Sequence, residues 1–263
     1  MTSPTKLLAT CLLFLITLGL FSCEKESPKN VINECIIIKE IDTLRIAPSL
    51  AKEVRDSITP DGILQLLIDG NLRFADTQNP YTVRNHSYSV RKSSLAGQHP
   101  MAIILSCLDS RIPVEDVFDR GVGDLFVARV AGNVVNPDIL ASMEFGTAVA
   151  GAKVILVVGH DKCGAVSAAL NPEPYIEAIS KRMNRDSLGD HELRNLQGLF
   201  SAINPSGDDL DAEIKANVIR TVKRISIESP IIGALVKNGD LIIKGAIYHM
   251  ATGKIEMLES NKE

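Results

Sequence analysis

Short apolar runs alternate along the chain with longer segments in which apolar residues recur at helical spacing. Four of these runs have the length and apolar character of strands that are buried on both faces; they span 101–107, 125–130, 154–158 and 241–247. Helical spacing is found in three segments, 60–74, 136–149 and 210–227. Strands separated by helix-length segments predict an α/β domain with a mainly parallel central sheet flanked by helices.

Two of the predicted helices begin at a recognisable signal. Thr59 can cap the first helix, because its hydroxyl can accept a backbone N–H, and Pro60 fits the first helical position. The pair Asn136-Pro137 starts the second helix. We therefore place the folded domain at residues 58–263.

The first 22 residues are predicted to be a signal peptide that does not belong to the fold. Lys6 precedes an uncharged 15-residue stretch, 7–21, which is shorter than a typical transmembrane helix. A small residue, Ser22, then stands directly before Cys23, which resembles the cleavage site of bacterial lipoproteins. Cys23 would carry the lipid, and the exported protein would be anchored to a bacterial cell membrane, facing the periplasm or the cell surface. Ordinary signal cleavage nearby and an uncleaved anchor are the alternatives.

Residues 23–57 are predicted to form a tether between the lipid and the domain. Segment 24–30 is rich in charged residues and contains Pro28, a composition typical of a solvated linker. The apolar residues between 36 and 46 fit either a short strand or a docking segment. Cys35 is interpreted as a half-buried thiol without a function.

The composition argues against some classes of function. Aromatic residues make up 4% of the chain, Trp is absent and the net charge is −4. Nucleic-acid binding depends on basic surfaces and on aromatic side chains that stack with bases, so we expect no nucleic-acid partner. Five cysteines in 263 residues are too few for a disulfide-based scaffold.

Three residues that can bind a metal lie at the ends of predicted strands. Cys107 closes the run 101–107, His160 follows the run 154–158, and Cys163 comes three residues later. In an open α/β sheet, ligands bind at the carboxyl ends of the strands, where the strand order reverses. A Cys2His set leaves one tetrahedral position free, which is typical of a catalytic zinc site.

The sequence around these residues resembles the β-class carbonic anhydrases. The resemblance is strongest in Cys-Leu-Asp-Ser-Arg at 107–111 and in Gly-His-Asp-Lys-Cys-Gly at 159–164. Further matching segments extend it over about 59–258; they are 70–74, 97–100, 123–129, 131–133, 142–145 and 245–248.

This resemblance implies a zinc enzyme that interconverts CO2 with bicarbonate and a proton through zinc-bound hydroxide. Cys107, His160 and Cys163 would bind one zinc ion per chain, and zinc lowers the pKa of a bound water to about 7 in three-His sites. Asp109 and Arg111 would form the catalytic carboxylate–guanidinium pair of the family. Asp109 would accept a hydrogen bond from the zinc-bound water or, in a closed form, become a fourth zinc ligand.

The resemblance also implies a substrate pocket and an assembly. Gln98, Phe126 and Ala131 match positions that line the pocket, and pockets of the family lie at a subunit interface, so a homodimer is the minimum assembly expected. Two positions differ from relatives. Phe145 stands where some relatives have Tyr, and Ile104 stands where allosteric relatives have Trp, which puts bicarbonate-driven closure in doubt for this chain.

Other interpretations of the same residues remain. Some relatives with this zinc motif hydrolyse carbon disulfide or carbonyl sulfide, so a zinc hydrolase is the alternative function. A protein in which zinc only joins strands would need neither Asp109 nor Arg111, and a disulfide between Cys107 and Cys163 would leave His160 unexplained.

The remaining polar residues near the motifs receive structural interpretations. Asp161 is interpreted as a turn-capping residue, with proton handling as the alternative. The four other histidines are interpreted as surface or locally hydrogen-bonded residues; they are His86, His99, His191 and His249.

Overall fold

The computed structural model describes residues 51–78 and 82–259, all of which belong to one compact unit, Ile38–Glu263. The predicted signal peptide, the lipidation site Cys23, Cys35 and most of the predicted tether lie outside the described residues. In the part that the structure describes, no helix is both long and apolar enough to cross a membrane.

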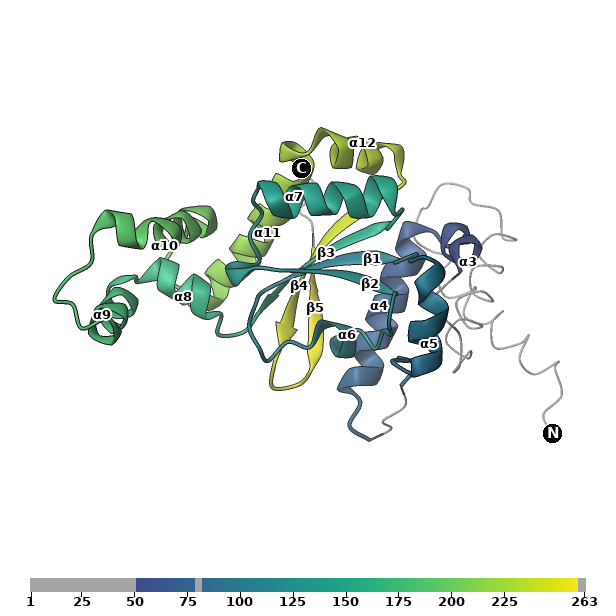
Figure 1. The fold of residues 1–263 in the computed structure, drawn as a ribbon, viewed down its shortest axis with the longest axis horizontal. Coiled ribbons are helices and arrows are strands. Elements are labelled where there is room, and N and C mark those ends of the chain that lie inside the picture. The colour runs from purple at the N-terminus through teal and green to yellow at the C-terminus, as the bar shows by residue number, and fades with distance from the viewer. Residues whose placement is uncertain (1–50, 79–81, 260–263) are drawn as a thin grey trace, which may run out of the picture. The chain divides into compact units, whose positions relative to one another are not determined.

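The described residues form a five-stranded sheet with the order β2-β1-β3-β4-β5 (Figure 1). The first three neighbouring pairs are parallel and the last pair, β4 with β5, is antiparallel. The predicted α/β fold with a mainly parallel sheet is therefore confirmed. The strands are β1 (Ala102–Ser106), β2 (Leu125–Arg129), β3 (Val154–His160), β4 (Ile242–His249) and β5 (Lys254–Leu258).

The two central strands are buried along their whole length. Every residue of β1 and β3 is shielded from solvent, which explains why both were recognisable as continuous apolar runs. β3 is longer than predicted and ends at His160, so this residue belongs to the strand and not to the turn after it. The edge strand β5 is half-exposed and was not predicted.

The capping signals act as predicted. In α4 (Pro60–Ala75), the Thr59 hydroxyl accepts the N–H of Gly62 at 3.1 Å. In α7 (Pro137–Glu144), the Asn136 side chain accepts the N–H of Ile139 at 2.9 Å. α7 continues into the π-helical turn η3 (Phe145–Val149), and α11 (Leu210–Glu228) covers the third predicted helical segment.

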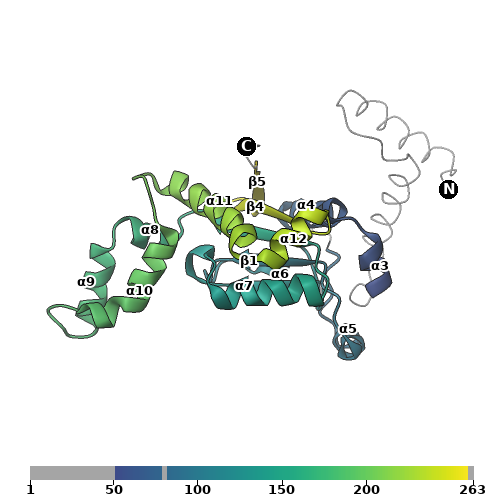
Figure 2. The same ribbon diagram turned by 90° about the horizontal axis from the view of Figure 1, so that it is seen from above.

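The other helices precede the first strand or lie in the connections between strands. Helix α3 (Lys52–Ser57) places the buried Arg55 side chain against Ala150, whose carbonyl it contacts. The three helices α8, α9 and α10 lie together beyond one end of the sheet in both views (Figures 1 and 2). The bounds are α5 (Tyr88–Ser93), η1 (Ser94–Ala96), α6 (Val114–Val117), η2 (Ala131–Asn133), α8 (Gly164–Leu170), α9 (Glu173–Arg182), α10 (Asp190–Ile203) and α12 (Pro230–Asn238).

The strand order determines where a site can form. From β1 the chain moves to β2 on one side and later returns to β3 on the other side, so the strand order reverses at β1. Parallel strands joined by right-handed crossovers then place α6 on one face and α7 on the other. The segment after β1 and the segment after β3 leave the sheet toward opposite faces. A crevice therefore remains between them at the carboxyl ends of these two strands.

Candidate metal centre

Strand pairing brings the predicted metal ligands together. In the register of β1 with β3, Ser106 lies opposite Val158, so the carboxyl ends of the two strands meet at the same edge of the sheet. Cys107 follows β1 directly, and His160 is the last residue of β3. A short turn after β3 then places Cys163 at the start of α8.

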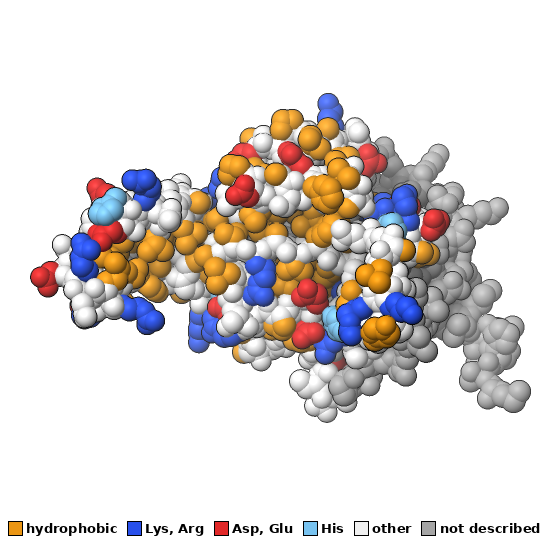
Figure 3. Space-filling view, in the orientation of Figure 1, with side chains coloured by type: hydrophobic (Ala, Val, Ile, Leu, Met, Phe, Trp, Pro, Cys, Tyr) orange, Lys and Arg blue, Asp and Glu red, His pale blue; other side chains and the backbone are white. Residues whose placement is uncertain are grey.

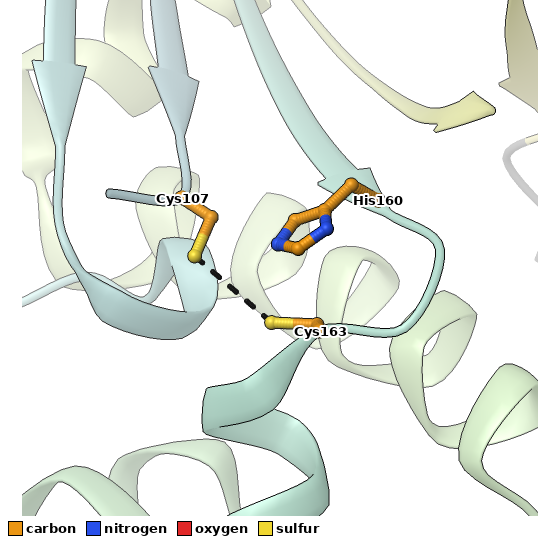
Figure 4. Close-up of side chains that lie close together, drawn as sticks. All are labelled: Cys107, His160 and Cys163. Atoms are coloured by element: carbon orange, nitrogen blue, oxygen red, sulfur yellow. Dashed lines mark hydrogen bonds between the residues drawn. The ribbon is translucent and has the colours of Figure 1, made fainter. Parts of the chain in front are cut away.

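The three side chains form a buried cluster. In the part of the chain that the structure describes, one group of potential ligands has all its atoms within 4.8 Å of one another, namely Cys107, His160 and Cys163. The two sulfur atoms are 4.0 Å apart and both cysteines are free thiols. Figure 4 shows the imidazole ring of His160 turned toward the two sulfur atoms. Two thiols and one imidazole are the ligands that zinc prefers in proteins.

The hydrogen bonding of His160 prepares one ring nitrogen for a metal. Nδ1 lies 2.9 Å from the carbonyl oxygen of Asp161, and because a carbonyl only accepts, Nδ1 must carry the proton. Nε2 is then an acceptor, and it is buried without a hydrogen-bond partner among the described residues. Such a buried polar atom costs about 1–3 kcal/mol unless it finds a partner. A metal ion bound at Nε2 removes this cost, so the residues fit zinc.

The ionisation of the three groups is strongly coupled. A hydrogen bond from the thiol of Cys163, and then the closeness of the His160 imidazole, lower the pKa of Cys107 to about 4, against the effect of burial. The same contact raises the pKa of Cys163, because its thiolate would form beside that of Cys107. Burial lowers the pKa of His160, but the nearby Cys107 thiolate raises it by more, so the net shift of this pKa is upward. A divalent cation would allow both sulfur atoms to be thiolates.

Asp109 and Arg111 form a bidentate ion pair beside the cluster. Arg111 Nη2 lies 2.7 Å from Oδ2 and Nε lies 2.9 Å from Oδ1, while the backbone N–H of Arg111 donates to Oδ1 at 3.0 Å. The Arg111 guanidinium holds the pKa of the Asp109 carboxyl well below its usual range. The carboxylate is thus ionised at neutral pH. In this structure Arg111 engages both carboxylate oxygens of Asp109. The closed form, with Asp109 as a fourth ligand, stays a prediction.

Two residues that the sequence analysis did not select also shape the site. Arg129, at the end of β2, donates from Nε to the carbonyl of Cys107 at 3.1 Å and contacts the carbonyl of Asp109 with Nη2. Asn217, on α11, donates to the carbonyl of Gly132 at 2.7 Å. The backbone N–H of Gly132 in turn lies 3.4 Å from the sulfur of Cys107.

Sequence signals for these two residues differ in strength. Arg129 is a basic residue at the carboxyl end of a predicted strand, which is a usable signal. Asn217 gives no sequence signal, because its partner Gly132 lies 85 residues earlier in the chain.

Gly132 has a φ of 67°, so its left-handed backbone conformation favours glycine at this position.

A cavity of about 540 Å³ opens beside the cluster. Cys107, Asp109 and Ala131 are among the residues that line it. Gln98 is exposed and Phe126 is half-buried, and neither lines this cavity. Most of the wall is apolar and comes from α8, α9 and α10, where Figure 3 shows hydrophobic side chains gathered on the surface. These include Ala165, Tyr175, Ile179, Leu196 and Phe200.

Comparison with known proteins agrees with this geometry. Residues 102–255 match the family model for carbonic anhydrase. The carbonic anhydrase of Mycolicibacterium smegmatis is 32% identical over 205 residues, which cover 75% of this chain and 93% of the relative. Carbonic anhydrase 2 of Mycobacterium tuberculosis is 33% identical over 204 residues, with coverage of 74% and 91%.

Among solved structures, the β-carbonic anhydrase CcaA matches with a TM-score of 0.51 and 24% identity, covering 66% of this chain and 84% of that one. This likeness concerns the fold alone, which is the α/β fold of the β-class carbonic anhydrases. The chain belongs to the carbonic anhydrase family, whose members are lyases.

Proposed function

We propose that the protein is a zinc-dependent carbonic anhydrase that converts CO2 and water reversibly to bicarbonate and a proton. The observation that carries the proposal is the buried Cys107–His160–Cys163 cluster, in which the acceptor nitrogen of His160 lacks a partner among the described residues. The ionised Asp109 carboxylate beside the cluster supplies the second element that the reaction needs.

The three clustered residues would hold one zinc ion per chain. When bound, zinc acts as a Lewis acid and makes a water molecule far easier to deprotonate. The chain contributes the two thiol sulfur atoms and the Nε2 atom of His160, whose other nitrogen is already fixed by the carbonyl of Asp161. A ring held in one orientation and one tautomer needs little rearrangement when the ion binds.

Asp109 would orient the reacting water. An ionised carboxylate only accepts hydrogen bonds, so it constrains the direction of the water's O–H bond and of its lone pairs. Arg111 keeps Asp109 ionised and fixes the plane of the carboxylate, and Arg129 holds the backbone carbonyls of Cys107 and Asp109 on the same strand end.

The pocket suits a small uncharged substrate. CO2 carries no net charge, so apolar walls such as Ala131 and the side chains of α8–α10 can surround it without an ionic contact. Gln98 and Phe126 match pocket positions but lie outside the cavity of their own chain. We propose that they act across the interface of a homodimer, in which each chain contributes to the pocket of the other.

We also propose that the protein is exported and anchored through a lipid on Cys23. The support is the sequence alone: an uncharged stretch of signal-peptide length that ends at a small residue and a cysteine. Such an anchor would hold the domain at a bacterial cell membrane by way of residues 23–57.

The decisive experiment measures metal content and CO2 hydration on the purified full chain. We expect one zinc ion per chain and turnover that disappears when a chelator removes the metal. Carbonyl sulfide and carbon disulfide are assayed in parallel on the same preparation. Turnover of either sulfur compound without CO2 hydration would assign the protein to the zinc hydrolases, and bound zinc without any turnover would overturn the enzymatic proposal.

A further inference from the structure

The turn that joins the two ligands His160 and Cys163 is fastened to a neighbouring strand. Lys162 in this turn has a φ of 53°, a left-handed backbone conformation that residues other than glycine rarely adopt. Such a turn persists only where surrounding contacts hold it. Asp161 provides them: its N–H donates to the carbonyl of Tyr248 at 3.2 Å, and its Oδ2 accepts the N–H of Met250 at 3.2 Å.

His249 completes the attachment. This residue ends β4, and its Nδ1 lies 3.0 Å from Oδ1 of Asp161. The carboxylate of Asp161 therefore bonds to residues 88 and 89 positions away, and it does not cap its own turn as the sequence suggested. The carbonyl of this same Asp161 is the group that accepts the Nδ1 proton of His160. One residue thus stands between the imidazole of His249 and the imidazole of the metal ligand.

His249 is itself held from the other side. Its Nε2 lies 3.0 Å from Oε2 of Glu256 on β5, and Oε1 of Glu256 lies 2.8 Å from Nζ of Lys215 on α11. Hydrogen bonds from Lys215 and then from His249 lower the pKa of Glu256, so this carboxylate is an acceptor at neutral pH. The chain of contacts from Lys215 to Asp161 joins α11, β5 and β4 to the ligand turn.

We propose that His249 is a positioning residue for the metal centre. Through the Asp161 carboxylate it fixes the Asp161 carbonyl that orients His160, and it holds the turn that sets the spacing between His160 and Cys163. The inference rests on the proposed metal-dependent function. It concerns how firmly the ligands are held, because His249 lies outside the cavity and touches none of the three ligands through a hydrogen bond.

Two amide substitutions, each of which replaces one ring nitrogen of His249, separate this role from a role that only joins β4 to β5. His249→Asn keeps an N–H donor at the position of Nδ1, which faces Asp161. His249→Gln keeps a donor at the position of Nε2, which faces Glu256. His249→Ala removes both contacts. Glu256→Gln, which leaves the contact between His249 and Asp161 in place, is the matched control.

The test follows zinc release from the loaded full-length protein into an excess of a metal-sensitive dye. We expect release from His249→Gln and His249→Ala to be about tenfold faster than from the wild type, which corresponds to the lower end of the loss in metal affinity when a residue behind a ligand is changed. Release from His249→Asn and Glu256→Gln should stay close to the wild-type rate. The visible spectrum of the cobalt-substituted protein should shift in the first pair of variants only.

The order of the rates decides the proposal. Equal rates for His249→Asn and His249→Gln, or wild-type rates for all variants, would overturn it, as would fast release from Glu256→Gln. If the wild type retains zinc but does not hydrate CO2, the proposed function fails while the zinc-release order still decides the role of His249. If the wild type retains no zinc, both proposals are wrong.

Discussion

The guanidinium of Arg111 contacts both carboxylate oxygens of Asp109, two residues earlier in the chain, at 2.9 Å and 2.7 Å. Asp109 lines the cavity, and the Arg111 side chain is largely exposed. An exposed ion pair contributes little to stability, commonly about 0–1 kcal/mol. Its position beside the metal cluster therefore points to a role in the reaction and not in folding.

Replacing Asp109 tests this interpretation. Asp109→Asn introduces an amide that can donate as well as accept, so the reacting water loses its fixed orientation. We expect kcat/KM for CO2 hydration to fall by about 100-fold, the lower range for loss of a positioned catalytic group, while zinc content stays unchanged. Asp116→Asn is a matched control, because Asp116 forms an exposed ion pair with Arg84 at 3.1 Å that lies outside the cavity. Equal activity of the two variants would remove Asp109 from the mechanism.

The cysteines are predicted to differ in their importance for metal binding. Cys107→Ser and Cys163→Ser each remove one sulfur ligand from the buried cluster, so both should lose zinc and, with it, activity. Cys35→Ser should retain both. Elemental analysis of the purified variants provides the measurement, and a full complement of zinc in Cys163→Ser would contradict the assigned ligand set.

The rate of CO2 hydration should rise toward alkaline pH. Two thiolates offset the charge of Zn²⁺, so water at this centre should be a weaker acid than at a three-His centre, where the pKa is about 7. The lowered pKa of Asp109 keeps its carboxylate ionised across the range, so its protonation does not produce the rise. We expect an apparent midpoint above about pH 7 in a profile from about pH 6 to pH 9. A flat profile, or a maximum at the acid end, is incompatible with this centre.

The anchor prediction rests on one residue. A lipoprotein cysteine carries several acyl chains, which together give stable membrane attachment, whereas a single chain binds only marginally. Cys23→Ser should therefore release the protein into the soluble fraction or block processing of the signal peptide. Fractionation and gel mobility provide the measurement. A variant that remains in the membrane fraction with unchanged mobility would exclude the lipid anchor.

The fold was largely predictable because its central strands are buried on both faces. β1 and β3 are continuous apolar runs, and no amphipathic alternation obscures them. β5 escaped prediction because it lies at the sheet edge, where Lys254 and Glu256 face solvent and break the apolar pattern. Residues 164–203 were assigned no element, although they form α8, α9 and α10, most of whose residues are exposed or half-buried.

The cluster of Cys107, His160 and Cys163 was predictable for a different reason. Its residues stand at strand ends, where parallel topology brings distant positions together. The hydrogen bonds that support this cluster were not predictable, because they depend on partners that strand order alone does not specify. His249 was interpreted as a surface or locally bonded residue, yet it reaches Asp161, 88 residues away. Asn217 reaches Gly132 in the same way, across 85 residues.

Strand order also determines when the folding chain could bind the proposed zinc ion. Cys107 and Cys163 are 56 residues apart in sequence and meet only when β3 pairs with β1, on the side opposite β2. An unfolded chain offers only the local pair His160 and Cys163, which is a much weaker chelator than three ligands held in place. Because such non-local pairing forms slowly, ion capture would come late during folding. Zinc uptake by the proposed site would therefore report when β3 pairs with β1 during folding.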